Sequence, residues 1–208
     1  MELVEPPFRH ATLGDAHALA ELINFAGEGL PLYLWEQMAE PGETAWDVGR
    51  RRARREEGSF SYRNAIVAEE GGRVVACLIG YPLPHEPEPI DPARMPPMSV
   101  PLQELENLAP GTWYVNVLAT YPEHRGLGHG TRLLRLAEGL AAGSGRAGLS
   151  IIVSDANTGA RRLYRRCGYV KRASRPMVKD AWENAGTNWV LLVKGPASPP
   201  SGKARAGT

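Results

Sequence analysis

Three glycines at alternate positions, Gly126, Gly128 and Gly130, lie between an apolar segment and an amphipathic one. Glycine has no side chain to shield the backbone, so the N–H groups of such a turn stay accessible. The segment that follows repeats leucine and alanine at helical spacing. A helix that begins at this turn adds unpaired N–H donors and the positive end of its dipole. The pattern therefore favours a turn that can bind phosphate oxygens.

Spacing alone leaves three interpretations of this turn. It can be a tight strand-to-helix turn that binds nothing. A dinucleotide-binding turn requires G-x-G-x-x-G, whereas the third glycine here comes one position too early, although Asp155 after the next strand could stand in for the ribose-binding acid. A P-loop requires a Gly-Lys-Ser or Gly-Lys-Thr ending, which this turn lacks.

A second pattern accompanies the first. Arg125-Gly-Leu-Gly-His-Gly resembles the Arg/Gln-x-x-Gly-x-Gly/Ala motif of the GNAT superfamily of N-acetyltransferases. Asn157, followed by Leu-Tyr-Arg-Arg-Cys-Gly-Tyr at 163–169, resembles that family's Asn and Leu-Tyr-x-x-x-Gly-Phe/Tyr stretch. The order of strand, motif, helix, strand, Asn and Tyr also agrees. The resemblance covers residues 110–173, and the two motifs together are much more specific than either one.

The resemblance implies an acetyl-coenzyme A site and a role for each residue at a motif position. Main-chain groups at the end of one strand would contact the pantetheine arm: Leu118, Ala119 and Thr120. Main-chain N–H groups of the glycine-rich motif would hold the pyrophosphate, and the motif consists of Arg125, Gly126, Leu127, Gly128, His129, Gly130 and Thr131. Asn157 would contact the pantetheine arm, and Tyr164 would lie beside the thioester sulfur.

The implied reaction is transfer of an acetyl group from acetyl-coenzyme A to a primary amine of a small molecule or protein, by direct attack of the amine. An amine with pKa ~10.4 costs about 4–5 kcal/mol to hold neutral at pH 7, so a base should lower the barrier. The departing thiolate would gain a proton from the Tyr164 hydroxyl. Two alternatives stay open: a catalytically silent module that binds acyl-coenzyme A for regulation, and a Tyr164 that only packs in the core.

The base is where this sequence departs from the family. Some relatives carry a glutamate on the strand before the Asn, but the corresponding position here is Ile152, which cannot accept a proton. Asn116 on the preceding strand cannot accept one either. Glu104 and Glu106 are close to that strand in sequence only, so the base stays unassigned.

The elements that must position these residues follow from periodicity and turn signals. The sequence predicts strands at 8–11, 63–69, 73–81, 113–119, 149–153, 169–173 and 188–193. It predicts helices from an N-cap at Asp15 and at 32–38, 44–57, 131–142 and 157–166. This is a mixed α/β (α+β) pattern. The resemblance implies a mostly antiparallel sheet flanked by helices and splayed at the cofactor-binding strand.

We expect a single N-acetyltransferase domain at 1–194 with a proline-rich insertion at 82–110 and a disordered tail at 195–208. The insertion holds nine of the chain's 18 prolines, which predicts an irregular segment rather than an uninterrupted helix. It is either a cover for the acceptor side of the cleft or a surface excursion without function.

Composition narrows the function further. The 208 residues carry 24 Lys and Arg against 23 Asp and Glu, and a net charge of +1 argues against nucleic-acid partners. His124 and His129 have no carboxylate or cysteine at ligand spacing, so we expect turn residues and no metal. The absence of a long apolar run or of a signal-like N-terminus predicts a cytoplasmic protein without membrane contact. The acceptor amine is not identified, and a homodimer is left open.

A basic cluster stands out at residues 50–55. It consists of Arg50, Arg51, Arg52, Arg54 and Arg55, followed by two glutamates. We interpret it as a solvated helix face with internal ion pairs. The alternative is a site for an acidic acceptor or for the ribose phosphate of coenzyme A.

Overall fold

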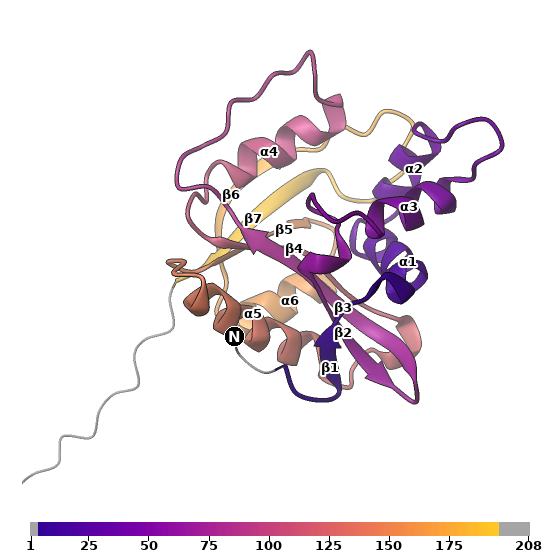
Figure 1. Cartoon of the computed structure of the whole chain (residues 1–208). Coiled ribbons are helices and arrows are strands. Elements are labelled where there is room, and N and C mark those ends of the chain that lie inside the picture. The colour runs from indigo at the N-terminus through magenta and orange to yellow at the C-terminus, as the bar shows by residue number, and fades with distance from the viewer. Residues whose placement is uncertain (1–3, 196–208) are drawn as a thin grey trace, which may run out of the picture.

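Two layers of helices enclose a seven-stranded sheet in the computed structural model, which describes residues 4–195 (Figure 1). The strands are Phe8–His10 (β1), Ala65–Glu70 (β2), Arg73–Pro82 (β3), Trp113–Thr120 (β4), Leu149–Ser154 (β5), Val170–Pro176 (β6) and Asn188–Lys194 (β7). The helices are Ala16–Ala26 (α1), Leu30–Glu36 (α2), Ala45–Ala53 (α3), Val100–Glu106 (α4), His129–Gly143 (α5) and Thr158–Arg166 (α6). No described helix is both long enough and apolar enough to cross a membrane. The predicted disordered tail lies outside the described residues from position 196 onward.

The sheet has the strand order β1-β2-β3-β4-β5-β7-β6. Every neighbouring pair is antiparallel except β4 and β5, which are parallel because α5 crosses over between them. The predicted mixed and mostly antiparallel sheet is therefore confirmed. Its β2–β3 hairpin turns at Gly71 and Gly72, whose φ angles of 56° and 76° lie in the left-handed region that glycine tolerates.

The sheet opens between β4 and β5. These strands pair only at their first residues, from Trp113 with Leu149 to Val115 with Ile151. Beyond that point β4 continues beside β3 as far as Thr120, while β5 continues beside β7 as far as Ser154. The two strands thus diverge toward their carboxyl ends, which confirms the predicted splay.

A β-bulge lies where the splay begins. Val115 pairs with Gly80 and Val117 pairs with Ile79, so Asn116 is an extra residue in β4 without a partner on β3. A bulge of this kind bends its strand and redirects the side chain of the extra residue. It places Asn116 at the edge of the opening between β4 and β5.

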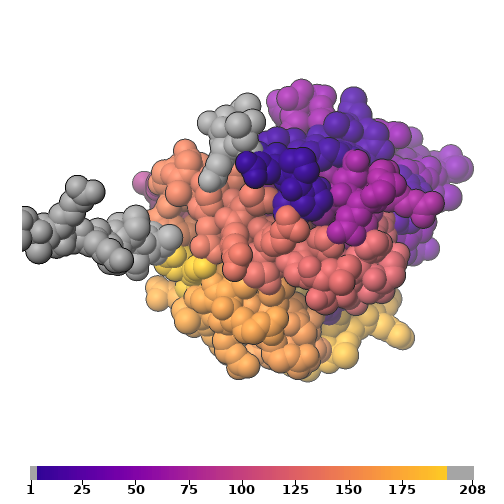
Figure 2. All heavy atoms as spheres, turned by 90° about the horizontal axis from the view of Figure 1, so that it is seen from below, coloured from indigo at the N-terminus to yellow at the C-terminus, as the bar shows by residue number. Residues whose placement is uncertain are grey.

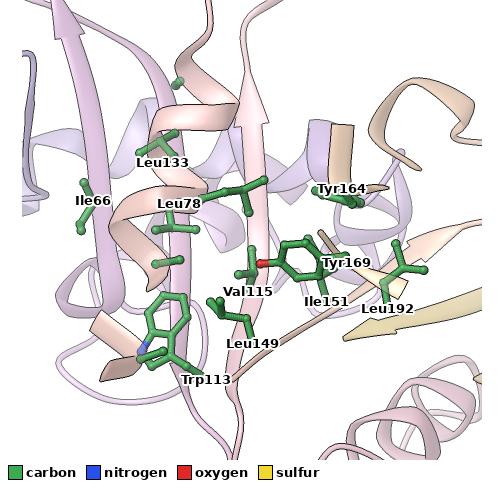
Figure 3. Close-up of a cluster of buried hydrophobic side chains, with 14 of the residues drawn as sticks. Ile66, Leu78, Trp113, Val115, Leu133, Leu149, Ile151, Tyr164, Tyr169 and Leu192 are labelled. Carbon is green, nitrogen blue, oxygen red and sulfur yellow. The ribbon is translucent and has the colours of Figure 1, made fainter. Parts of the chain in front are cut away.

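Separate apolar clusters hold the helices on the two faces of the sheet. On the face covered by α5 and α6, Leu133 packs over Leu78 and Val115, and Tyr164 packs beside Tyr169 (Figure 3). On the other face, α1 and α3 pack through a second cluster, and α4 packs with the start of α2 through a third (Figure 1). The splay is consequently flanked by α5 and α6 on one face of the sheet and by α1 to α4 on the other.

Two predicted segments differ from the structure. The helix predicted at 44–57 ends at Ala53, and Arg54 is its C-cap. Glu56, beyond this end, forms an ion pair with Arg63 in place of a contact within the helix. The proline-rich segment is not irregular throughout, since it contains the helix α4. Pro101 lies in the first turn of α4, where a missing backbone N–H costs no helical hydrogen bond.

Asp15 occupies the N-cap position of α1 but does not cap it with its side chain. Its carboxylate instead accepts hydrogen bonds from Arg9 at 2.8 and 2.9 Å and from the Thr12 backbone at 2.7 Å. Burial by itself raises the pKa of Asp15, but these hydrogen bonds outweigh it and hold that pKa below its usual range. The N-cap position was therefore predicted correctly, but the expected hydrogen bond from the Asp15 side chain to the helix is absent because the Arg9 guanidinium binds that carboxylate.

Candidate active site

A cavity of about 600 Å³ occupies the opening between β4 and β5 and extends to α5 and α6. We call it the cofactor-side cavity. Most of the residues predicted for the site line it: Leu118, Ala119, Thr120, Arg125, Gly126, Gly128, His129, Gly130, Thr131, Asn157 and Tyr164. Leu127 does not, since its side chain points outward and is 63% exposed. Figure 2, which views the molecule from below, shows the salmon-coloured α5 region directly beside the orange α6 region.

The glycine-rich turn has the backbone that its composition predicts. Gly126 and Gly128 have φ angles of 80° and 87°, and no heavy atom lies within 4 Å of a Cβ built on either residue. Gly128 is the N-cap of α5, which begins at His129, two residues earlier than expected. The open backbone of the turn and the unpaired N–H groups at the N-terminus of α5 therefore adjoin the same cavity.

Gly130 has a different role from the other two glycines of the motif. A Cβ at this position would lie 3.0 Å from Cδ2 of Leu163 on α6. Its lack of a side chain allows α5 and α6 to approach closely at the cavity.

The two histidines of the turn contact a glutamate at the end of β2. Nε2 of His129 lies 3.3 Å from Glu70, and Nδ1 of His124 lies 3.5 Å from the other oxygen of that carboxylate. His129 is buried at the first position of α5. Neither contact is a hydrogen bond, and within residues 4–195 both ring nitrogens of His129 are buried without a hydrogen-bond partner. Within residues 4–195, no three His, Cys, Asp or Glu side chains are arranged to hold a metal ion.

Tyr164 belongs both to the core and to the wall of the cofactor-side cavity. Its ring belongs to the apolar cluster under α5 and α6 and lies 5.9 Å from the ring of Tyr169 between centroids. The same side chain lines the cofactor-side cavity. Burial, followed by the nearby charges of Cys167 and Glu28, raises the pKa of Tyr164 well above its usual range. Its hydroxyl consequently keeps its proton at neutral pH and can act as a donor.

Asn157 is the N-cap of α6 and is held from both ends of its amide. Its Oδ1 accepts from the backbone N–H of Ala160 at 3.0 Å, and its Nδ2 donates to Glu28 at 2.7 Å. The other oxygen of Glu28 accepts from Asn184 at 2.7 Å. Glu28 also lines the cofactor-side cavity and has a φ of 52°, uncommon for a residue other than glycine. No local sequence pattern predicts Glu28 as a site residue, because its partner Asn157 lies 129 positions away.

Asp155 gives no support to the dinucleotide interpretation. Its carboxylate accepts hydrogen bonds from the Thr187 hydroxyl at 2.8 Å and from the Asn188 amide at 2.9 Å. Hydrogen bonds from Asn188 and Thr187 hold the pKa of Asp155 far below its usual range. Asp155 therefore joins the end of β5 to the start of β7 and is not among the residues that line the cavity.

A second cavity, of about 370 Å³, lies on the opposite face of the sheet between α1–α3 and α4. We call it the acceptor-side cavity. Its lining is mostly apolar and aromatic and includes Trp35, Phe60, Tyr81, Met95, Leu102 and Tyr114. It shares four lining residues with the cofactor-side cavity: Ala26, Asn116, Ile152 and Trp189. The two cavities thus meet at the splay, beside the bulge of β4.

Two charged side chains, Arg52 and Glu106, line the acceptor-side cavity. Arg50 and Arg51 make the expected ion pairs, with Asp47 at 2.6 Å and Glu43 at 2.9 Å. Arg52 does not fit the prediction of a solvated face, because burial lowers its pKa and, within residues 4–195, its Nε is buried without a hydrogen-bond partner.

The two glutamates left open as bases differ in their surroundings. Glu104 makes an ion pair with Arg175 at 2.6 Å and does not line the cavity. Glu106, two residues further along α4, lines it. Periodicity alone does not separate them, since the orientation of α4 depends on its packing against β6 and β7.

Comparison with known proteins agrees with this fold. The model of the acetyltransferase (GNAT) family matches residues 31–169, and the chain belongs to that family. An acetyltransferase of known crystal structure has a TM-score of 0.62 and 21% identity, over 91% of this chain and 99% of its own. An N-acetyltransferase from Staphylococcus aureus Mu50 has a TM-score of 0.59 and 18% identity, over 89% and 98%. A ribosomal-protein-alanine N-acetyltransferase from Brucella melitensis has a TM-score of 0.55 and 21% identity, over 90% and 98%. No curated protein matches the sequence significantly.

Proposed function

We propose that this chain transfers an acetyl group from acetyl-coenzyme A to a primary amine. The observation that carries the proposal is the meeting of two cavities at the splay, one beside the glycine-rich turn and the other lined mainly by apolar side chains. A phosphate-bearing donor and an amine can then approach one another from opposite faces of the sheet. Membership in the GNAT acetyltransferase family supports the same reaction.

The residues of the cofactor-side cavity fit the parts of the donor. Backbone N–H groups of the turn and of the first turn of α5 would hold the pyrophosphate. The end of β4 has no partner on its β5 side, so the main-chain groups of Leu118 to Thr120 that face away from β3 would contact the pantetheine arm, with Asn157 across the opening. The Thr120 carbonyl also accepts a hydrogen bond from Nε of Arg125 at 3.2 Å, which the arm would have to share or displace. The thioester carbonyl would lie near the junction of the two cavities.

Tyr164 would act on the leaving group. The amine attacks the thioester carbonyl, a C–N bond forms, the C–S bond breaks, and the thiolate takes up a proton from the Tyr164 hydroxyl. Burial raises the pKa of Tyr164 and makes its hydroxyl a weaker acid, so the proton would be transferred only as the thiolate charge develops in the same buried site. The amine must also lose a proton, which requires an acceptor on the other side of the splay.

The direct test mixes the purified chain with acetyl-coenzyme A and a panel of amines: phenethylamine, ethanolamine and a short peptide with a free N-terminus. We expect free thiol to appear faster than in the amine-free control with at least one of them. Calorimetry of acetyl-coenzyme A binding accompanies the assay. A chain that binds acetyl-coenzyme A and releases no thiol with any amine would be a silent acyl-coenzyme A-binding module.

We also propose that the proline-rich segment helps to determine which acceptor amine can bind, since Met95 and Pro96 line the acceptor-side cavity. Replacing residues 89–96 with Gly and Ser at equal length leaves the buried Leu83, Met98 and α4 intact. We expect kcat/KM for the acceptor to change by a factor on the order of 10, as for the loss of one apolar pocket contact. The dissociation constant of acetyl-coenzyme A should not change. A matched variant that replaces only 89–94 should behave as the parent, and unaltered acceptor kinetics in the longer replacement would make the segment a surface excursion.

A further inference from the structure

The acceptor-side cavity contains one carboxylate, and that carboxylate has no partner. Glu106 lies at the last position of α4, and within residues 4–195 no hydrogen bond or ion pair engages its side chain. Glu104, on the same short helix, is neutralised by Arg175. A charged carboxylate in a largely apolar cavity is costly, so it either takes up a proton or binds a ligand of opposite charge.

The walls around Glu106 indicate the kind of amine that fits. Tyr81, Leu102 and Tyr114 line the cavity with Glu106, and the rings of Tyr81 and Tyr114 lie 5.7 Å apart edge to face. Trp189, which lies at the junction with the cofactor-side cavity, is also buried. Apolar and aromatic walls stabilise an apolar body, and the single carboxylate can orient an ammonium group.

Resting on the function proposed above, we propose that the acceptor is a primary amine with an apolar body and that Glu106 binds its ammonium group and removes one proton before the amine attacks. The proton passes from nitrogen to the Glu106 carboxylate and then to solvent. The nitrogen lone pair forms the amide C–N bond as the C–S bond breaks. The thiolate takes its proton from the Tyr164 hydroxyl, and the second proton that the nitrogen loses on forming the amide restores that hydroxyl, so the overall reaction yields the amide, the free thiol and one proton.

The electrostatics of the cavity suit a base that works near neutral pH. Burial raises the pKa of Glu106 to about 7, and the charge of Glu88 adds to this. The other ionisable groups around it are Tyr81 of β3 and Tyr114 of β4, whose pKa values are raised mainly by burial, while Arg52 of α3 lines the same cavity. A carboxylate with a pKa near the working pH combines a sizeable deprotonated fraction with a strong attraction for the proton.

Other acidic groups near the splay are less suited. Both carboxylate oxygens of Glu28 already accept hydrogen bonds, from Asn157 and Asn184. Ile152 and Asn116, which lie at the junction itself, cannot accept a proton from an ammonium group. Glu106 is therefore the acidic side chain that the described residues place on the acceptor side.

The test compares Glu106→Gln with Glu104→Gln, using phenethylamine as the acceptor. At pH 8 we expect kcat of Glu106→Gln to fall by a factor on the order of 10². The kcat of the parent should decline below pH about 7, where Glu106 becomes protonated, and this decline should be absent in Glu106→Gln. Glu104→Gln should keep both the rate and the pH profile. Acetyl-coenzyme A affinity, measured by calorimetry, should be the same in all three proteins.

Each outcome bears on one proposal. A Glu106→Gln variant with undiminished kcat, or with the acidic decline still present, would overturn the role of Glu106 while leaving the acetyltransferase function standing. Faster transfer to ethanolamine than to phenethylamine in the parent would overturn the apolar acceptor class. A parent that binds acetyl-coenzyme A but acetylates no amine would overturn the proposed function, and the role of Glu106 with it.

Discussion

Replacing Gly128 with valine is expected to raise the dissociation constant of acetyl-coenzyme A by at least about 100-fold. Gly128 has a φ of 87° and is the N-cap of α5. A β-branched residue in this region is strained by about 1–3 kcal/mol, and relief of that strain would move the turn. Each charge-assisted hydrogen bond lost to the pyrophosphate adds about 1.5–3 kcal/mol. Titration calorimetry with acetyl-coenzyme A measures the change directly.

Gly42 offers a matched control for this substitution. It has nearly the same backbone angle, with a φ of 86°, and no heavy atom within 4 Å of its Cβ position, but it does not line either cavity. Gly42→Val should therefore carry a similar strain and leave acetyl-coenzyme A affinity unchanged. If a folded Gly128→Val variant binds acetyl-coenzyme A as tightly as the parent, the turn does not hold the pyrophosphate.

Tyr164→Phe is expected to lower kcat by a factor on the order of 10²–10⁴, the range for loss of a positioned proton donor. The substitution removes one hydroxyl and leaves the ring in its apolar cluster. Acetyl-coenzyme A affinity should stay nearly unchanged, because the hydroxyl would act only on the developing thiolate. Steady-state kinetics with a saturating amine, together with calorimetry, separate the two effects.

Tyr169→Phe is the corresponding control. The two tyrosines are neighbours in the same cluster, and burial raises the pKa of both. Tyr169 does not line the cofactor-side cavity, and its buried hydroxyl has no hydrogen-bond partner within residues 4–195. Its removal should leave kcat unchanged. Equal rates for Tyr164→Phe and the parent would reduce Tyr164 to a packing residue.

Features with a local cause could be predicted from the sequence. The alternate glycines predicted the turn before α5, because a positive φ at Gly126 and Gly128 depends only on the absence of a side chain there. Leucine and alanine at helical spacing predicted α5 itself, since the period of one helix is independent of its neighbours. The strands predicted at 63–69 and 73–81 are joined by a turn at Gly71 and Gly72, where a positive φ again requires no side chain.

Features that join distant segments were decided only by tertiary structure. The bulge that places Asn116 at the splay depends on the register between β3 and β4, which no local pattern records. The contact of Glu28 with Asn157 joins residues 129 positions apart. Glu104 and Glu106 are two residues apart and alike in sequence, yet packing turns one toward Arg175 and the other into the acceptor-side cavity. Side-chain environment, burial and pKa arise from such packing, so the sequence determined where the glycine-rich turn lies and the fold decided which groups line the acceptor-side cavity.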